Sequence, residues 1–436
     1  MSQLDRIERL AKKAYSDQKT DLDRVNQILY LLDNPQNQYP VIHIAGTNGK
    51  GSTAAMLHSI LQTAGYKSGL YTSPHFLSCN ERIRINNHLI TDTDLELCLA
   101  KVFSIPISTE LSYFEILTVT AFCYFASKKI DFLVCETGLG GRLDATNAVK
   151  NKLVSIITSI DFDHTEILGD NLAKIAYEKA GIFLKGVPIV TNTGHAITDK
   201  ILTKQSSLKN CPIFFYDRDF YSQKPTTNWQ KLKQTFSYRG IDNNYSQIEL
   251  AMLGEHQIMN ATLALASIEI IKKQYPISNQ SIYKGLKKAS WSGRFEIRKL
   301  QYKDKSLTFI LDGAHNAAGS IVLQKTLAAS PYAKTNLVFI MNVLCDKDYQ
   351  SICSNLSKLA KKVIILQINN QRVLETNILH KEWQKYLPNS KIYIANNFMD
   401  VFKFLDNIDT SICVTGSLYV VAETLFFLKN AGLHAD

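Results

Sequence analysis

The sequence predicts an α/β protein of two domains, each built on a central sheet of parallel type. Three observations support this prediction. A short β-branched strand, Val41–Ala45, runs directly into a glycine-rich turn and then a helix. Apolar strands alternate with helical stretches in both parts of the chain. Finally, 436 residues are too many for one ordinary domain and enough for two complete cores. We expect an N-terminal domain of residues 1–295 and a smaller domain of residues 296–436.

The composition is that of a globular protein without a membrane anchor. Apolar residues make up 45% of the chain and charged residues 20%, and no apolar run approaches the length of a membrane span. The N-terminus lacks the apolar core of a signal peptide, so we expect a cytoplasmic protein. Its eight cysteines form no C-x-x-C pair, which argues against a zinc site or a disulfide framework and predicts reduced, mostly buried thiols.

The formal charge of +10 comes from 49 Lys and Arg against 39 Asp and Glu. Such a charge is compatible with nucleic acid and equally with small anionic substrates drawn into a cleft. No basic block or RNA-binding aromatic motif favours nucleic acid. We therefore expect small-molecule substrates, and neither a nucleic-acid nor a membrane partner.

The turn after Val41–Ala45 has the features of a phosphate-binding loop. Its glycines free backbone N–H groups to face an anion at the start of a helix, which we expect at Ser52. Lys50 would lie between the β- and γ-phosphates of ATP, and the hydroxyl of Ser52 or Thr53 would bind the bridging Mg²⁺. The expected ATP-binding residues of this loop are Gly46, Thr47, Asn48, Gly49, Lys50, Gly51, Ser52 and Thr53. The alternative is a glycine turn without a ligand, which does not require this lysine.

Two further predicted strands lead into polar groups. Asp131–Glu136 is apolar, ends on a carboxylate and precedes a glycine-rich turn in which Leu143 excludes the dinucleotide-binding pattern. Leu153–Ser159 runs into an acidic turn that contains His164. Because the carboxyl ends of such strands meet at one edge of an open α/β sheet, Glu136 and His164 are expected near Lys50. His164 is therefore a candidate ligand for a second divalent ion.

The remaining N-terminal elements frame this sheet. Helices around Leu4–Tyr15 and Asp21–Leu32 should brace it. Tyr113–Lys128 is apolar nearly all round and predicts a buried helix. Within that helix Glu115 is costly to bury unless paired, so a functional role and a capping or salt-bridged role both fit. Residues 217–247 are polar and irregular, and we expect a hairpin insertion without chemistry of its own.

The C-terminal part again alternates strands with helical stretches. The expected strands are Leu307–Asp312, Leu337–Met341, Val363–Gln367, Ile392–Ala395 and Ser411–Thr415. This alternation predicts a Rossmann-like α/β domain.

About six motifs stand in the order found in one enzyme family. They are GTNGKGS from Gly46, TSPH from Thr72, ETGLGGRLDATN from Glu136, EKAGI from Glu178, WSGRFE from Trp291 and DGAHN from Asp312. Together they resemble the folate branch of the Mur ligase superfamily, dihydrofolate synthase and folylpolyglutamate synthase. The resemblance spans both expected domains. The chain departs from it where Ser292 and Ala317 replace prolines, and Ile44 and Gly51 depart from the general phosphate-loop pattern.

The resemblance implies roles for individual residues. Ser73, Glu136 and His164 would bind Mg²⁺, in two ions. Lys179 would be carbamylated by CO₂, with a surface lysine paired to Glu178 as the alternative. The residues expected to contact ATP outside the loop are Asn260, Arg294, Asp312 and His315. Those expected to contact the substrate are Phe114, Glu115 and Arg142.

The function implied by the resemblance is that of a monomeric, ATP-dependent amide ligase. A substrate carboxylate would be phosphorylated to an acyl phosphate, which L-glutamate would then attack. Lys50, Glu136, His164 and Lys179 would carry the catalysis. The first substrate would be dihydropteroate, a folate, or both, so a monofunctional folylpolyglutamate synthase is an alternative. A cell-wall Mur ligase would carry a further domain ahead of its phosphate loop, and a GTPase should show the guanine-binding motif N-K-x-D, which is absent.

Overall fold

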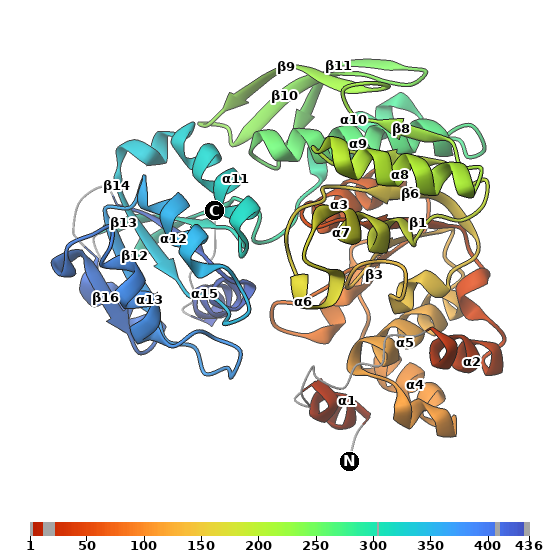
Figure 1. Ribbon diagram of the computed structural model, residues 1–436, viewed down its shortest axis with the longest axis horizontal. Helices are drawn as coiled ribbons and strands as arrows, with labels where there is room; N and C mark the ends of the chain where they lie inside the picture. Colours follow the sequence, from red (N-terminus) through yellow and green to blue (C-terminus); the bar gives the residue numbers. More distant parts are fainter. Residues whose placement is uncertain (1–2, 12–21, 303–304, 406–409, 431–436) are drawn as a thin grey trace.

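The chain folds into two α/β units that lie side by side, each with its own sheet (Figure 1). The computed structural model describes residues 3–11, 22–302, 305–405 and 410–430. The first predicted helix is present as α1, Gln3–Ala11, and the rest of the predicted range 4–15 lies outside the described residues. The second is α2, Asp23–Leu31. Among the described helices, none has the length and apolarity needed to cross a membrane.

The N-terminal sheet has eight strands in the order β4-β3-β2-β5-β1-β6-β7-β8. Their bounds are β1 Val41–Ala45, β2 Ser68–Tyr71, β3 Ile83–Ile85, β4 His88–Leu89, β5 Phe132–Glu136, β6 Lys152–Ile157, β7 Ile189–Thr191 and β8 Ile213–Phe215. The strands from β2 through β8 in this order are parallel, while β3 and β4 form an antiparallel edge. The predicted α/β class with a sheet of parallel type is confirmed.

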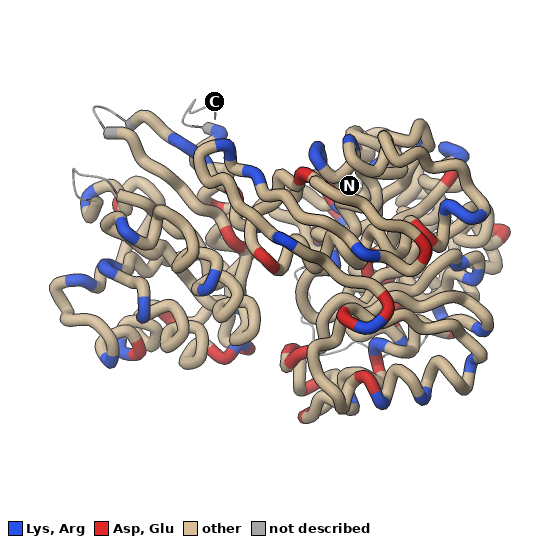
Figure 2. The backbone as a smooth tube through the Cα atoms, turned by 90° about the horizontal axis from the view of Figure 1, so that it is seen from above, with Lys and Arg blue, Asp and Glu red and all other residues tan. Residues whose placement is uncertain are grey.

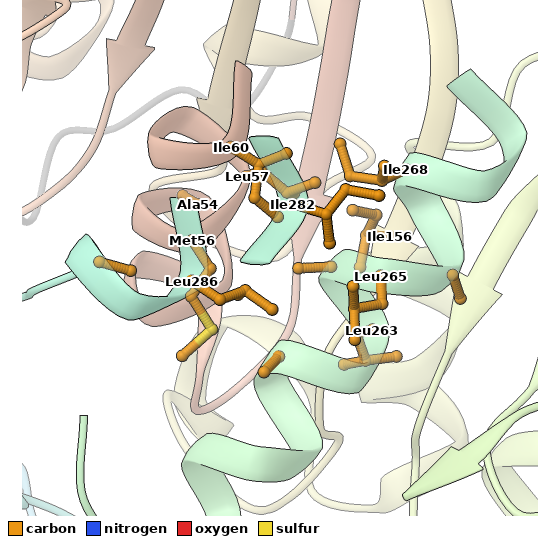
Figure 3. Close-up of a cluster of buried hydrophobic side chains, with 14 of the residues drawn as sticks. Ala54, Met56, Leu57, Ile60, Ile156, Leu263, Leu265, Ile268, Ile282 and Leu286 are labelled. Atoms are coloured by element: carbon orange, nitrogen blue, oxygen red, sulfur yellow. The ribbon is translucent and has the colours of Figure 1, made fainter. Parts of the chain in front are cut away.

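Helices cover both faces of this sheet, which is why its central strands can be apolar throughout. The helices are α3 Lys50–Thr63, α4 Asp92–Phe103, α5 Tyr113–Ser127, α6 Thr165–Leu168, α7 Leu172–Ala180, α8 Ala196–Leu208, α9 Glu255–Ile271 and α10 Asn279–Lys288. Apolar side chains of α3, α9 and α10 pack together with Ile156 of β6 on one face (Figure 3). On the other face α5 is buried along most of its length, as predicted.

The predicted hairpin insertion is present, but it has a third strand and forms an antiparallel sheet, so the expectation of irregular structure was wrong. Its strands are β9 Tyr221–Asn228, β10 Lys233–Arg239 and β11 Asn244–Leu250, in the order β11-β10-β9. The register shifts along β10, and the backbone is left-handed at Lys224, Leu232 and Gln247. These bulges interrupt the alternation of apolar and polar residues that identifies a strand in a sequence.

The same small sheet reaches across to the C-terminal unit (Figure 1). In the turn between β9 and β10, the ring of Trp229 lies 6.0 Å from the ring of Phe295 and 6.3 Å from that of Tyr332, measured between centroids. Trp229 packs there on the apolar core of the C-terminal unit. The insertion is therefore a second connection between the two units, besides the covalent link.

The C-terminal sheet has six strands in the order β12-β13-β17-β14-β15-β16. The strands are β12 Glu296–Tyr302, β13 Lys305–Leu311, β14 Asn336–Met341, β15 Lys362–Leu366, β16 Ile392–Ala395 and β17 Thr410–Thr415. The helices are α11 Ala317–Ala328, α12 Tyr349–Ser357, α13 Thr376–Trp383, α14 Phe398–Val401 and α15 Leu418–Asn430. Only β12 is antiparallel to its neighbour, and it was not predicted. The five predicted strands are present within a few residues of their expected ends.

All eight cysteines are free, and five of them are buried, as the sequence predicts. Lys and Arg are spread over both units and interspersed with acidic residues, rather than gathered in one band (Figure 2).

Candidate active site

Four adjacent strands bring the predicted site residues to one edge of the N-terminal sheet. In the sheet order β2-β5-β1-β6, all four strands are parallel. Ser73 follows β2, Glu136 ends β5, Lys50 follows β1 and His164 follows β6. The carboxyl ends of parallel strands lie at the same sheet edge, which is the usual position of a ligand site in open α/β folds.

The phosphate loop has the conformation of a cradle. Helix α3 begins at Lys50, two residues earlier than predicted, because Gly49 in the left-handed region (φ 88°) ends the turn. A side chain at Gly49 would be strained there, and its Cβ would lie 2.4 Å from Oδ1 of Asn260. Lys50 Nζ donates hydrogen bonds to the carbonyl oxygens of Gly46 and Thr47, at 3.1 and 3.2 Å. The lysine is thus held against its own loop.

Residues at the end of β6 hold this loop in place. Thr47 Oγ1 donates to the carbonyl of Asp161 at 3.1 Å, and the N–H of Asp161 donates back to Thr47 Oγ1 at 3.0 Å. Ser159 Oγ accepts from the N–H of Asn48 at 3.0 Å. The loop is therefore held by Ser159 and Asp161, two residues to which the sequence analysis assigned no role.

Glu136 is buried, with 4% of its surface exposed, and faces the loop lysine. Its Oε1 lies 4.0 Å from Lys50 Nζ, and its Oε2 accepts the N–H of Ser73 at 3.2 Å. Burial raises the pKa of Glu136, while the positive charge of Lys50 opposes that shift. A buried carboxylate next to a phosphate loop is a position where a bound cation would offset its desolvation.

The donors around the loop fit a magnesium ion bound with phosphate and water. The hydroxyls of Ser52 and Thr53 are buried and have no hydrogen-bond partner among the described residues. Among all the residues that the structure describes, no three or more His, Cys, Asp and Glu side chains lie close enough together to bind a metal ion by themselves. Mg²⁺ typically takes one or two carboxylates and completes its shell with phosphate oxygens and water. Glu136 with these hydroxyls meets that pattern.

Lys179 is buried in the last turn of α7, with 3% of its surface exposed. Burial, with a further contribution from the charge of Lys50, lowers the pKa of Lys179 to about 7. No hydrogen bond or ion pair to its ammonium occurs within the described ranges. The surface pairing with Glu178 is excluded, because Glu178 pairs with Arg142 instead, at 2.9 Å.

The loop after β5 is packed tightly against the end of α7. The N–H of Arg142 donates to the carbonyl of Glu178 at 2.8 Å, and Asn147 Nδ2 donates to that of Gly181 at 3.2 Å. Buried Lys152 donates to Asn147 Oδ1 and to the carbonyl of Ile182, at 2.8 and 2.7 Å. This network fixes the loop that follows Glu136 relative to the helix that carries Lys179.

The edge of the C-terminal unit meets the acidic turn after β6. Asp163 Oδ1 lies 2.6 Å from Lys347 Nζ, and its Oδ2 lies 3.7 Å from His315 Nε2 and accepts from Asn316 Nδ2 at 3.0 Å. Burial raises the pKa of Asp163, but His164 and His315 when protonated, together with the charge and hydrogen bond of Lys347, hold that pKa well below its usual range. Asn316 also exchanges hydrogen bonds with Asn48 of the phosphate loop, at 3.2 and 3.3 Å.

His164 and His315 lie on the two sides of this contact. Burial lowers the pKa of His164 to about 4, against the raising effect of Asp163, and burial also lowers the pKa of His315. Both rings are therefore neutral at pH 7 and have a lone pair available as an acceptor or a metal ligand. Neither Asp163 nor Lys347 was assigned a role from the sequence, although the D-F-D-H run and the family-like D-K-D run at Asp346 contain them.

Two residues predicted to contact the nucleotide from the C-terminal side, Asp312 and Arg294, form hydrogen bonds with backbone groups. Asp312 is buried, and its two carboxylate oxygens accept the N–H groups of Phe295 and Ala314, each at 2.9 Å. Burial raises its pKa, and the nearby charge of Arg294 opposes this. The Arg294 guanidinium donates to the carbonyl of Gly293 at 3.1 Å. Its charge also acts on Glu136, so the link between the units lies close to the phosphate-loop site.

Of the predicted substrate residues, Glu115 has a local role. It forms a capping box with Ser112 at the start of α5, in which its carboxylate accepts the Ser112 N–H at 2.7 Å. Its other oxygen lies 3.5 Å from Arg24. The structure therefore shows the capping and salt-bridged role that the sequence left open. Phe114 packs over Gly138 in the loop after β5, and Arg142 is about half exposed beside Glu178.

An open cleft of about 420 Å³ separates the two units next to Glu136. One wall comes from the turn after β2, including Ser73 and Phe76, and from Arg84. The other comes from the link around Trp291 and from β12 and α15 of the C-terminal unit. A substrate in this cleft would have one end at Glu136 and the phosphate loop.

This fold and site define a class of enzyme. A phosphate loop, a buried carboxylate and a second α/β unit closing on them form the arrangement of a nucleotide-dependent phosphoryl-transfer or ligase enzyme. Comparison with known families agrees. Residues 44–268 match the Mur ligase middle domain, and residues 295–427 match the dihydrofolate synthetase C-terminal domain. The chain belongs to the Mur ligase family.

Curated relatives place it within that family. The chain is 32% identical to a dihydrofolate synthase/folylpolyglutamate synthase of Bacillus subtilis, over 94% of this chain and 95% of that protein. It is 30% identical to a folylpolyglutamate synthase of Lacticaseibacillus casei, over 92% and 93%. Both matches run nearly end to end. The chain is therefore an ATP-dependent ligase of the dihydrofolate synthase/folylpolyglutamate synthase type, and not a cell-wall Mur ligase or a GTPase.

Solved structures agree with this assignment over the whole fold. Folylpolyglutamate synthase of Mycobacterium tuberculosis, complexed with ADP and AMPPCP, superposes with a TM-score of 0.88 at 29% identity, covering 100% of this chain and 99% of that one. The enzyme of Thermotoga maritima superposes with a TM-score of 0.84 at 33% identity, covering 99% and 98%.

Proposed function

We propose that this enzyme attaches L-glutamate both to dihydropteroate and to folates, at a single site between the two units. The observation that carries the proposal is the set of contacts at the sheet edge. Glu136 contacts both Lys50 and the backbone N–H of Ser73 there, and the cleft opens beside them. That arrangement suits a carboxylate substrate whose reacting end must meet the terminal phosphate of ATP.

The reaction consists of two displacements. First, an oxygen of the substrate carboxylate attacks the γ-phosphorus of ATP, and the bond to the β-γ bridging oxygen breaks, which releases ADP and leaves an acyl phosphate. Then the amine of glutamate attacks the acyl carbon. The phosphate leaves with the electron pair of its bond, and the amine loses a proton.

The charges at the sheet edge have defined tasks in the first step. Negative charge grows on the transferred phosphoryl oxygens, and the cations Lys50 and Arg294 would offset it. Glu136, Ser73 and Ser52 would hold one Mg²⁺, and neutral His164 would hold a second. Bound Mg²⁺ supplies further positive charge to the phosphate oxygens. Phosphate binding requires Lys50 to exchange its two loop carbonyl acceptors for phosphate oxygens.

Lys179 would carry a carbamate. With a pKa lowered to about 7, its amine is largely neutral at slightly alkaline pH and can react with CO₂. The product is an anion on a long stem, which would face the cations of the site rather than be repelled by them. Buried Lys179 has no competing partner among the described residues, which supports this assignment.

The C-terminal unit would complete the nucleotide site. Asn260 of the N-terminal unit lies against Gly49, and His315 lies 3.7 Å from Asp163 where the two units meet. Asp312 directly follows β13, three residues before His315, and all three side chains would face the nucleotide. We place the domain boundary at residues 295 and 296 and expect one chain to carry a whole site, as a monomer. The free thiols fit a reducing, cytoplasmic setting.

The alternative is a single activity. Relatives of similar identity carry either name alone, as in the dihydrofolate synthetase of Saccharomyces cerevisiae at 30%, or both names. ADP release by the purified enzyme with L-glutamate, measured with dihydropteroate and separately with tetrahydrofolate, decides between them. Release with both substrates supports the proposal, release with one supports a monofunctional enzyme, and release with neither contradicts it.

A further inference from the structure

The cleft between the units has an inner end, at Glu136 and the phosphate loop, and an outer end, at Lys429. Helix α15 forms one wall, and Leu418, Leu425, Leu428 and Lys429 all line the cleft. Leu418 and Arg294 both crowd Gly313, where an added Cβ would lie 2.4 and 2.5 Å from their side chains. The start of α15 is therefore at the phosphate end. Lys429 stands eleven residues further on, roughly 16 Å along the helix axis at 1.5 Å per residue.

Two lysines of the cleft lining lie away from the phosphate end, because β12 leads from Glu296 at the link to Lys299 and α15 leads from Leu418 to Lys429. Lys429 lies in the last turn of α15, and Lys299 lies on β12, the edge strand of the same unit. Both are exposed and line the cleft. Neither ammonium has a hydrogen bond or an ion pair among the residues that the structure describes.

The other charged side chains that line the cleft all have partners. Arg298 pairs with Glu296. Glu81 accepts the N–H groups of Phe76, Leu77 and Ser78, at 2.8, 2.9 and 3.1 Å. Arg84 donates to the carbonyl of Glu81 at 3.3 Å and lies over the ring of Trp291. Arg294 and Glu136 belong to the inner end described above. The unbalanced charge of the cleft is therefore positive and lies at its outer end.

A substrate that already carries several glutamates has negative charges that would complement these two lysines. Each glutamate is attached through its amine, and when one of its carboxylates is later joined to the next glutamate its other carboxylate stays free. A substrate already extended by several residues is therefore a chain of anions. Its reacting carboxylate must lie at Glu136, and the earlier ones trail outward along the cleft. A substrate with no attached glutamate presents no second carboxylate to the outer end.

We propose that Lys299 and Lys429 bind the free carboxylates of glutamates already attached to the substrate, and so determine how well longer substrates are used. The proposal rests on the proposed function and adds to it two residues that would set the preference for substrates with a longer glutamate chain. The apolar side chains between the two ends, among them Phe76 and Leu425, suit the uncharged aromatic part of a short substrate.

The test compares the full-length enzyme with K299Q, K429Q and the double variant on monoglutamyl and triglutamyl tetrahydrofolate. Lys358→Gln is the matched control, because Lys358 is an exposed lysine of the same unit that does not line the cleft. Exposed charge pairs are each worth up to about 1 kcal/mol, so KM for the triglutamyl substrate should rise about three- to tenfold in the double variant. KM for the monoglutamyl substrate should change less than about twofold.

A second readout is the dependence on salt. The rise in KM for the triglutamyl substrate between low and high salt should be smaller in the double variant than in the wild type. Equal changes for both substrates, or none for either, would overturn the proposal. So would a wild-type enzyme that extends the monoglutamyl substrate and rejects the triglutamyl one. A wild type that uses neither substrate nor dihydropteroate would instead refute the proposed function itself.

Discussion

Asp163 and Lys347 lie in different units of the molecule, and their charged atoms are 2.6 Å apart. Both side chains are at least nine-tenths buried. The same carboxylate also contacts His315 and accepts from Asn316, so one residue after β6 meets three residues of the C-terminal unit. Since Asn316 also bonds to Asn48, the phosphate loop and the contact between the units form one connected network.

Replacing Asp163 with Asn should weaken the closed arrangement while leaving each unit folded. Removal of the nearer partner from this buried ion pair leaves Lys347 only the more distant Asp346, so the lysine would favour an open cleft exposed to water. We expect a loss of roughly a hundredfold in kcat/KM, measured by ADP release. Asp346→Asn is the control, because Asp346 also faces Lys347, at 3.4 Å, but lies within the C-terminal unit. If the two variants lost kcat/KM to the same extent, the role assigned to Asp163 in joining the units would be wrong.

Lys50→Ala should abolish ATP turnover and leave the fold intact. The phosphoryl group would lose its nearest cation in a partly dehydrated site, and we expect a decrease of about a thousandfold or more in kcat. Circular dichroism and thermal unfolding would verify the fold. Ligation at near wild-type rates by this variant would contradict the assignment of the phosphate loop.

Glu136→Gln keeps the shape of the side chain and removes its charge. A neutral amide is a poor ligand for a hard cation, so the Mg²⁺ concentration needed for half-maximal activity should rise about tenfold or more. The amide would still accept the N–H of Ser73, which preserves the local hydrogen bond. An unchanged Mg²⁺ titration would show that Glu136 is not a ligand.

Lys179→Ala should lose most activity, and a small carboxylic acid such as acetate should restore part of it by replacing the carbamate. In the wild type, the pKa of about 7 means that the amine is mainly protonated below pH 7 and mainly neutral above it. Uptake of CO₂ by the CO₂-depleted enzyme should therefore increase as the pH rises through 7. Isotopically labelled CO₂ followed by NMR measures this directly. Full activity of the alanine variant would exclude the carbamate.

Local patterns allowed the phosphate side of the site to be predicted. A glycine-rich turn with Lys50, and an apolar strand ending on Glu136, are properties of short segments. The parallel sheet then brings such strand ends together. Glu115 was also within reach of the sequence, because Ser112 three residues before it is the signature of a capping box. That signal favours the local role which the structure shows.

The contact between the units was not predictable in the same way. Asp163 and Lys347 are 184 residues apart, and Asn48 and Asn316 are 268 apart. No local pattern in a single sequence relates such positions, because their pairing depends on how two separately folded units dock. The small sheet β9–β11 was missed for a different reason, since its bulges interrupt strand periodicity.

The packing of Trp229 on Phe295 and Tyr332 restricts how the molecule can move. Besides the contact around Asp163, which opening of the cleft would break, the C-terminal unit is attached at the covalent link near Arg294 and at the tip of the β9–β10 turn. These two attachments favour one motion of the C-terminal unit, a hinge rotation about the line that joins them. Twisting or sliding of the C-terminal unit would break the contacts of Trp229 with Phe295 and Tyr332. Opening of the cleft would then always expose the same edge, so substrates would enter and products leave along one path.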